Sequence, residues 1–178
     1  MSKIQTHSGK VFDFFEPTPD MIDIKDIAHS LANLCRFTGH TKEFYSVAKH
    51  SVFASKMVPQ ELSLQALLHD ATEAYVGDLN SPLKDILPEF KTIETHIWSV
   101  IATKFGVPVE MDPLVKQADM ALLHAESLKY LAPCQDSHLW DHIQSNYLRP
   151  IIPDYYDNSP GHWKGAFLER FEELTTVI

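Results

Sequence analysis

The stretch LQALLHDATEAYVGDLNSPLK, residues 64–84, decides both the fold and the function that we expect. Its first part is apolar on most sides of a helix, which is the pattern of a helix buried in the middle of a bundle. Four side chains that are costly to bury stand in this stretch: His69, Asp70, Glu73 and Asp78. We predict a helix over residues 61–76 that Gly77 ends, and a loop after it.

Apolar residues recur at three- and four-residue intervals along the rest of the chain, which predicts further amphipathic helices around the buried one. Caps, glycines and prolines mark their ends, and the predicted helices cover about residues 24–39, 42–58, 61–76, 88–105, 113–131 and 161–176. The stretch KVFDFFEPTPDM, residues 10–21, contains two prolines and predicts a short extended arm or small hairpin. Residues 133–160 are rich in proline and aromatic residues, and we expect loops around one short helix there.

The fold class that follows is all-α, a single domain over residues 1–178 with a short N-terminal extended arm. We expect its core at about residues 20–130, followed by a C-terminal loop and helix at 131–178. The chain has 15 basic and 24 acidic residues, a net charge of −9. This balance argues against a nucleic-acid or anionic-membrane partner, because such binding depends on Lys and Arg that neutralise phosphates. A small anionic substrate stays open, since a local metal ion or a few basic side chains can override a distant field.

The cysteines and the apolar segments of the chain indicate in which cellular compartment we expect the protein. Cys35 and Cys134 are the chain's two cysteines, and they have no paired spacing. Two isolated cysteines indicate a reducing compartment rather than a disulfide framework. The first residues contain no apolar core of signal-peptide length, and no run of 18 apolar residues occurs. We therefore expect a cytoplasmic protein.

The polar residues of the predicted buried helix have neighbours of the same chemistry on other helices. His50 and Asp119 both fall on the apolar sides of their predicted helices. We therefore expect four side chains from three helices to converge in the core: His50, His69, Asp70 and Asp119. Imidazole nitrogens and carboxylate oxygens together suit a first-row divalent cation such as Zn²⁺, Mn²⁺, Fe²⁺ or Co²⁺. The spacing alone equally allows ordinary hydrogen-bonded core residues.

The order His50, His69–Asp70, Asp119 resembles the H…HD…D signature of the HD-domain metal-dependent phosphohydrolases. The flanking sequences RFTGHTKEFYSVAKHS (36–51) and ALLHDATEAYVGDLNSPLK (66–84) look like one branch of that superfamily. This branch contains bacterial 5′-deoxynucleotidases and small phage or bacterial HD hydrolases, including phage dATP triphosphohydrolases. The resemblance covers roughly residues 5–130, and it implies an HD-domain helical bundle that holds a divalent metal ion (Zn, Co, Mn, Fe or Mg).

The resemblance also implies a role for each matching residue. The four metal ligands are implied to be His50, His69, Asp70 and Asp119. Glu73 matches the acid beside the attacking water, Asp78 matches a second catalytic acid, and Arg36 matches the arginine that contacts the substrate phosphate. Phe37 stands where the family's nucleotidases often have tryptophan, so this departure leaves the recognition of sugar and base open.

Other candidate substrate-binding residues come from the sequence pattern, each with an ordinary alternative. Lys84 is a second candidate for phosphate binding or a solvated loop lysine. His40 is a candidate to stack on the nucleotide or a turn residue, and Phe37 is either a wall of the substrate pocket or a core aromatic residue. Glu126 lies further along the Asp119 face and is a candidate to support a metal ligand from behind, but a surface glutamate is the safer assumption.

The expected function is metal-dependent hydrolysis of deoxynucleotide phosphate esters, by a 5′-deoxynucleotidase or a dATPase-like dNTP triphosphohydrolase. The lack of a Lys or Arg cluster favours a monophosphate, whereas the compact, phage-like sequence favours a dNTP. The expected partner is a small-molecule nucleotide, and we expect a homo-oligomer. The alternatives are a cyclic-nucleotide phosphodiesterase and a non-catalytic nucleotide-sensing or structural-metal domain. Glu73 and Asp78 argue against the non-catalytic domain, because a closed structural site needs no acids beyond its ligands.

Overall fold

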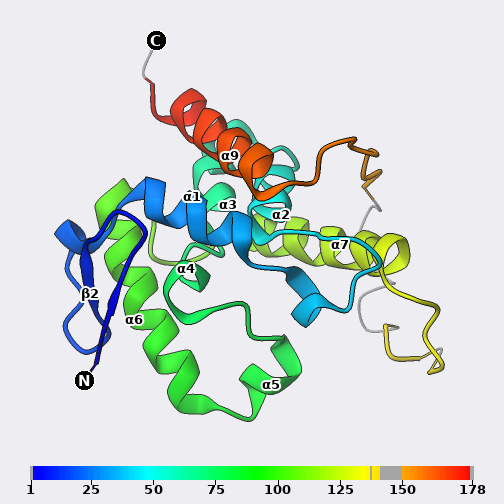
Figure 1. Ribbon diagram of the computed structural model, residues 1–178, viewed down its shortest axis with the longest axis horizontal. Coiled ribbons are helices and arrows are strands. Elements are labelled where there is room, and N and C mark those ends of the chain that lie inside the picture. Colours follow the sequence, from blue (N-terminus) through cyan, green and yellow to red (C-terminus); the bar gives the residue numbers. More distant parts are fainter. Residues whose placement is uncertain (1, 137, 141–149, 177–178) are drawn as a thin grey trace.

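The computed structural model describes residues 2–136, 138–140 and 150–176. The protein is mainly α-helical, with one small two-stranded sheet at its N-terminal end (Figure 1). In chain order the helices are η1 (Pro19–Met21), α1 (Ile24–Asn33), η2 (Arg36–Gly39), α2 (Val47–Ala54), η3 (Gln60–Leu62), α3 (Ser63–Leu68), α4 (Glu73–Val76), α5 (Ser81–Asp85), α6 (Pro88–Phe105), α7 (Pro113–Tyr130) and α9 (Pro160–Thr175). None of the described helices combines the length and apolar character that a membrane span requires.

The N-terminal arm is a hairpin of β1 (Lys3–Gln5) and β2 (Val11–Asp13), which pair antiparallel. Phe12 on β2 is fully buried, and its ring stacks on that of Tyr75 with the centroids 4.1 Å apart. The hairpin turn is fixed to α1 by Asp26, whose carboxylate accepts hydrogen bonds from the Ser8 backbone N–H (2.6 Å) and from the Thr6 hydroxyl (2.7 Å). The arm is therefore attached to the helical core at its strand and at its turn.

The core lies around α1, which crosses the middle of the molecule with α9 packed along it (Figure 1). Ile27 and Leu31 of α1 are fully buried, and they share one hydrophobic core with Trp163 and Phe167 of α9. The C-terminal helix thus belongs to the same core as the helices of residues 20–130. Trp163 is 2% exposed and is a packing residue of this core.

The first predicted helix is shorter than the sequence pattern indicates. It ends at Asn33 rather than near Gly39, because the next residues form an isolated antiparallel bridge between Cys35 and Ser46. This bridge closes the base of a loop that starts with η2. Inside η2, Phe37 and Thr38 have φ values of 54° and 53°, in the left-handed region that costs energy for residues with a side chain.

The second predicted helix is also shorter. It starts at Val47 instead of residue 42, because the Ser46 hydroxyl accepts a hydrogen bond from the Lys49 backbone N–H (3.2 Å) and caps it there. It ends at Ala54 instead of residue 58.

The buried helix over residues 61–76 is not continuous, so that prediction was wrong. It is divided into η3, α3 and α4, and residues 69–72 form a turn between α3 and α4. The His69 ring N–H donates to the Ala66 carbonyl oxygen (Nδ1–O 2.7 Å), the acceptor that a regular α-helix would offer to the N–H of Asp70. The backbone bonds that follow run over three residues, as from Glu73 N–H to Asp70 O (3.0 Å).

The loop after Gly77 is shorter than predicted. Asn80 caps α5 by accepting a hydrogen bond from the Leu83 backbone N–H (3.1 Å), so part of the expected loop is helical. Gly77 itself has φ of 83°, a value that glycine adopts without strain. The described parts of residues 133–159 contain neither helix nor strand, and the short helix expected in this segment falls outside the described residues.

Candidate metal centre

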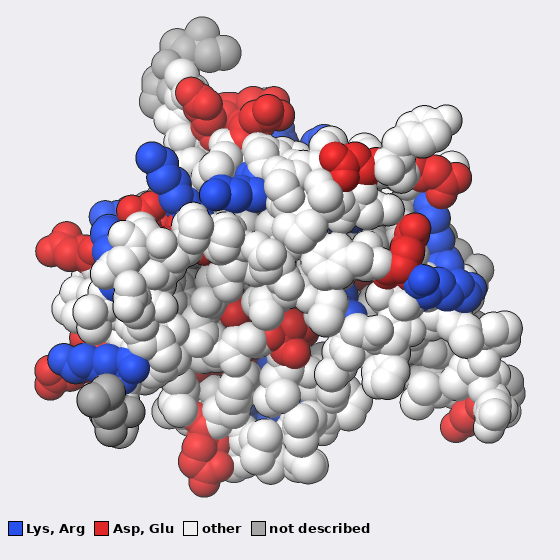
Figure 2. Space-filling model, viewed as in Figure 1, with Lys and Arg blue, Asp and Glu red and all other residues white. Residues whose placement is uncertain are grey.

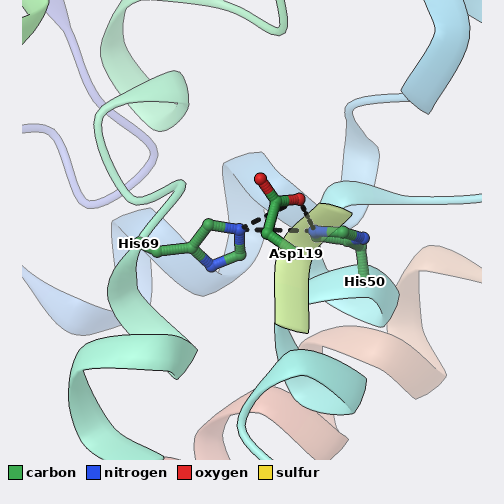
Figure 3. Close-up of side chains that lie close together, drawn as sticks. All are labelled: His50, His69 and Asp119. Carbon is green, nitrogen blue, oxygen red and sulfur yellow. Dashed lines mark hydrogen bonds and ion pairs between the residues drawn. The ribbon is translucent and has the colours of Figure 1, made fainter. Parts of the chain in front are cut away.

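Three of the predicted ligands meet in the interior from three separate elements (Figure 3). His50 comes from α2, His69 from the turn after α3, and Asp119 from α7. Their donor atoms all lie within 4.8 Å of one another, with His50 Nε2 3.0 Å from Asp119 Oδ1 and 3.3 Å from His69 Nε2. His69 Nε2 lies 3.8 Å from the same Asp119 oxygen. These donor atoms are close enough together, and of the right chemical types, to hold a metal ion.

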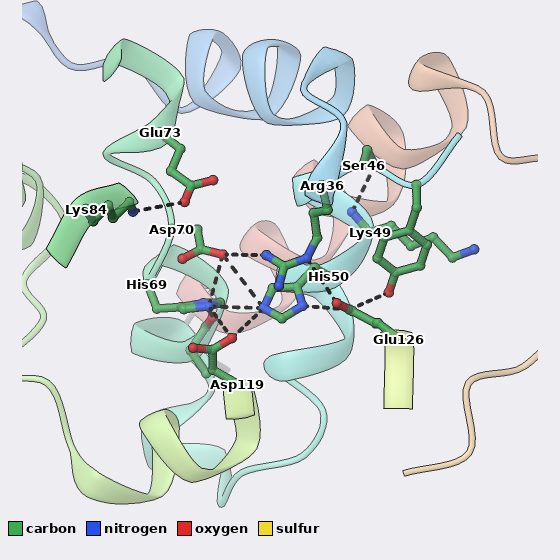
Figure 4. A network of polar contacts seen from close by, with 12 residues as sticks. Arg36, Ser46, Lys49, His50, His69, Asp70, Glu73, Lys84, Asp119 and Glu126 are labelled. Carbon is green, nitrogen blue, oxygen red and sulfur yellow. Dashed lines mark hydrogen bonds and ion pairs between the residues drawn. The ribbon is translucent and has the colours of Figure 1, made fainter. Parts of the chain in front are cut away.

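The fourth predicted ligand, Asp70, stands beside this group. Its Oδ2 atom is 3.1 Å from His69 Nε2 and 3.7 Å from His50 Nε2. Arg36 Nη1 lies 3.4 Å from the same oxygen, so Asp70 is shared between the two imidazoles and a guanidinium (Figure 4). Asp70 follows His69 in the turn between α3 and α4.

The hydrogen bonds of the two histidines orient their free nitrogens toward the same point. His69 Nδ1 faces a backbone carbonyl oxygen, which can only accept, so this nitrogen carries the proton. His50 Nδ1 lies 2.7 Å from Glu126 Oε1, a carboxylate oxygen, and donates to it. Held in this way, both imidazoles turn Nε2 toward the same point, and each offers a lone pair to an ion once that nitrogen has lost its proton. A cation between them satisfies both, so the residues fit a divalent metal ion.

The charges around the centre favour a positive ion. Burial lowers the pKa of His69, but Asp70 and Asp119 outweigh it and hold that pKa well above its usual range. Burial likewise opposes ionisation of Asp70, yet the nearby His69 keeps the pKa of this carboxyl at about 2. The pKa of Asp119 is also well below its usual value, because hydrogen bonds from His50 and His69 exceed the effect of burial. The field that favours a proton at this point favours a metal cation as well.

Glu73, the predicted catalytic acid, begins α4 next to the centre and is 5% exposed. Its Oε2 atom is buried, and among the described residues it has no hydrogen-bond partner. Burial and the charges of Asp70 and Asp78 raise the pKa of Glu73 well above its ordinary value. The pKa of Asp78 is raised too, mainly by burial. A buried carboxylate with one oxygen free of described partners, beside a cation site, is an arrangement in which that oxygen can accept a proton.

Lys84 on α5 faces Glu73 and α6. Its Nζ atom lies 2.7 Å from Glu94 Oε1 and 3.6 Å from Glu73 Oε1. The side chain is 18% exposed, so Lys84 is not the solvated loop lysine that the sequence left open. Its two carboxylate partners engage it within the protein.

Arg36 is buried in the loop closed by the Cys35–Ser46 bridge, with 8% of its surface exposed. Its Nε atom donates to Glu126 Oε2 at 3.0 Å. Glu126 is fully buried, so the expectation of a surface glutamate was wrong. The sequence signal that could have located it is the seven-residue interval from Asp119, which is about two turns along the same face of a helix.

The other predicted substrate residues lie around the loop of η2. The Phe37 ring lies 5.7 Å from the Arg36 guanidinium carbon, and the ring is half-buried. His40 is exposed at the end of this loop, and none of its described contacts joins it to the centre. Thr38 and Asn80 connect the loop to the start of α5 by a long hydrogen bond of 3.5 Å. Figure 2 shows acidic side chains in a hollow near the middle of the face seen in Figure 1. The Asp119 side chain is 33% exposed, so the centre is accessible to solvent.

Comparison with known proteins places the chain among relatives. No model of a known protein family matches it. A protein named "Uncharacterized protein RCAP_rcc00048" from Rhodobacter capsulatus is 33% identical over 121 residues, 62% of each chain. "Uncharacterized protein YfdR" from Escherichia coli (strain K12) is 44% identical over 180 residues, which cover 99% of this chain and 98% of YfdR. Identity at this level over the full length of both proteins means that this chain belongs to the YfdR family.

Proposed function

We propose that this protein is an HD-domain metal-dependent phosphohydrolase that acts on deoxynucleotides. One observation carries the proposal: beside the donor group of His50, His69 and Asp119 stands Glu73, whose buried Oε2 atom has no hydrogen-bond partner among the described residues. A closed structural metal site has no use for such a carboxylate, whereas a hydrolytic site needs a proton acceptor beside its cation.

His50, His69, Asp70 and Asp119 are the side chains that would hold the metal ion. When bound, a divalent cation supplies Lewis acidity, which neutralises phosphoryl oxygens and lowers the pKa of a coordinated water. The Asp119 side chain is 33% exposed, so solvent and a small ligand can approach the donor group from its side.

The acids beside the centre have complementary tasks. Glu73 accepts a proton from the water that attacks phosphorus, and its raised pKa makes it a stronger base than an exposed glutamate. The phosphorus–oxygen bond to the nucleoside then breaks, and the leaving oxygen takes a proton from Asp78.

Arg36 is the side chain that we assign to the phosphate. Its guanidinium is permanently charged and lies within 3.4 Å of Asp70, at the edge of the donor group. The forked N–H groups of an arginine match two phosphate oxygens at once. The basic side chains described at the centre are few, and Lys84 is already engaged by Glu94 and Glu73. This charge balance favours a single phosphate, as in a 5′-deoxynucleotidase, over the triphosphate of a dNTP.

The test is to incubate protein loaded with Mn²⁺, Co²⁺ or Zn²⁺ with each dNMP and each dNTP and to identify the phosphate product. Orthophosphate from a dNMP supports the nucleotidase, and tripolyphosphate from a dNTP supports the triphosphohydrolase. The same incubation with a His69→Ala protein controls for a contaminating phosphatase. If no metal gives either product, the proposal is wrong.

A further inference from the structure

Glu126 has an unusual position for a carboxylate, because it is fully buried in the middle of a polar network (Figure 4). Three donors surround it: His50 Nδ1 at 2.7 Å, the Tyr45 hydroxyl at 2.7 Å and Arg36 Nε at 3.0 Å. A buried carboxylate is costly unless such partners are present. Burial raises the pKa of Glu126, but the charge of Arg36 heads the interactions that outweigh it and lower that pKa.

The two oxygens of Glu126 serve different parts of the site. Oε1 accepts from His50 and Tyr45, and Oε2 accepts from Arg36. His50 points its other nitrogen into the metal centre, and Arg36 points Nη1 toward Asp70. One rigid carboxylate thus fixes the ring of a metal ligand and the guanidinium assigned to the phosphate.

These contacts join segments that are far apart in the sequence. Glu126 lies 76 residues from His50 and 90 residues from Arg36. The backbone of Arg36 is held locally, at the start of η2 and by the bond from its N–H to the Tyr45 carbonyl oxygen (2.9 Å). The direction of the guanidinium is set by long-range contacts, of which the bond to Glu126 (3.0 Å) is shorter than the one to Asp70 (3.4 Å).

We propose that Glu126 is a positioning residue that prepares metal binding through His50 and anion binding through Arg36 at the same time. A carboxylate that accepts from the second N–H of a metal-bound imidazole fixes its tautomer and raises its basicity, and its loss costs about 10- to 100-fold in metal affinity. The anion part rests on the proposed function. The metal part does not, since it requires only that the donor group binds an ion.

The experiment compares Glu126→Gln with the wild-type protein by titration with Co²⁺ alone, followed by visible absorption. We expect about 10- to 100-fold weaker Co²⁺ binding and an altered ligand-field spectrum, because Gln cannot offer carboxylate oxygens to both His50 and Arg36. Inorganic phosphate, titrated into the Co²⁺-loaded proteins, is expected to bind more weakly to the variant. Glu169→Gln, an exposed glutamate of α9, is the matched control and keeps wild-type affinities.

Two further variants separate positioning from packing. Tyr45→Phe removes one donor but leaves His50 and Arg36 bonded, so its loss of Co²⁺ affinity stays below about tenfold. Glu126→Asp keeps the charge, but its side chain is too short to reach both His50 and Arg36. We expect this variant to bind both Co²⁺ and phosphate more weakly. It replaces Glu126→Gln if circular dichroism shows that Glu126→Gln does not fold.

The outcomes are distinct. A folded Glu126 variant with wild-type Co²⁺ affinity and spectrum overturns the inference, and so does a Tyr45→Phe protein that loses as much as Glu126→Gln. If the wild-type protein hydrolyses no nucleotide but Glu126→Gln still binds Co²⁺ more weakly, the proposed function fails and the role of Glu126 at the metal centre stands.

Discussion

The Nε2 atoms of His50 and His69 face each other at 3.3 Å, while the Nδ1 atom of each ring is already committed as a donor. In neutral rings these nitrogens would bring two lone pairs together, which is favourable only when a positive charge, a proton or a metal ion, lies between them. Glu126 and the Ala66 carbonyl thus fix the tautomers that metal binding requires.

Removal of one of these rings should remove the metal. We expect purified His69→Ala protein to contain no stoichiometric divalent metal by mass spectrometry and to lack hydrolytic activity. The control is His96→Ala, an exposed histidine of α6, which keeps both. A His69→Ala protein that keeps full activity without metal would refute the assigned centre.

Removal of the metal ion by a chelator should destabilise the wild-type protein. An ion that binds only the folded state stabilises that state, and the stabilisation grows with the logarithm of the ratio of ion concentration to Kd. With an ion at about 100 times its Kd, this contribution is about 2.7 kcal/mol. EDTA should therefore lower the thermal midpoint of metal-loaded wild-type protein and leave that of His69→Ala unchanged. Equal shifts in the two proteins would contradict this.

Glu73→Gln should separate chemistry from metal binding. The amide has nearly the same shape but cannot accept the proton of the attacking water, so kcat should fall by about 10² to 10⁴ while the metal content stays at the wild-type level. Glu89→Gln, an exposed glutamate of α6, serves as the matched control. Undiminished turnover in Glu73→Gln would remove Glu73 from the mechanism.

Lys84→Met should change the pH dependence of hydrolysis. The charge of Lys84 lowers the pKa of Glu73, which burial, Asp70 and Asp78 raise. Without that charge the pKa of Glu73 rises further, so the base is protonated up to a higher pH and the acidic limb of the kcat profile moves upward. If Lys84 instead bound the substrate phosphate directly, the variant would raise KM and leave this limb in place.

Phe167→Ala should destabilise the fold. This ring of α9 is fully buried in the core shared with α1, so its truncation is expected to cost about 3–5 kcal/mol in the free energy of unfolding, measured with urea. Leu128→Ala, a residue 58% exposed on α7, should stay within about 0.5 kcal/mol of wild type. A small effect of Phe167→Ala would mean that α9 is dispensable for the core.

Residues of the centre could be predicted from the sequence where the local spacing of apolar residues determines which way a side chain faces. His50, His69 and Asp119 follow the apolar sides of their helices, and this periodicity is a property of a few consecutive residues. Periodicity places Glu126 on the same helix face as Asp119 but does not predict its burial, which depends on Arg36 and Tyr45, more than 80 residues away in the sequence. The same periodicity missed the break before Glu73, since it does not register a side chain that takes a backbone acceptor.

The break between α3 and α4 affects how His69 and Asp70 would bind an ion. Successive side chains of a regular α-helix point about 100° apart around its axis, so an adjacent histidine and aspartate would diverge. In the turn between α3 and α4 the two instead bring Nε2 of His69 and Oδ2 of Asp70 to 3.1 Å, so that both side chains can reach one ion. Substitutions that restore a regular helix over residues 69–72 are expected to move these two atoms apart without altering either side chain.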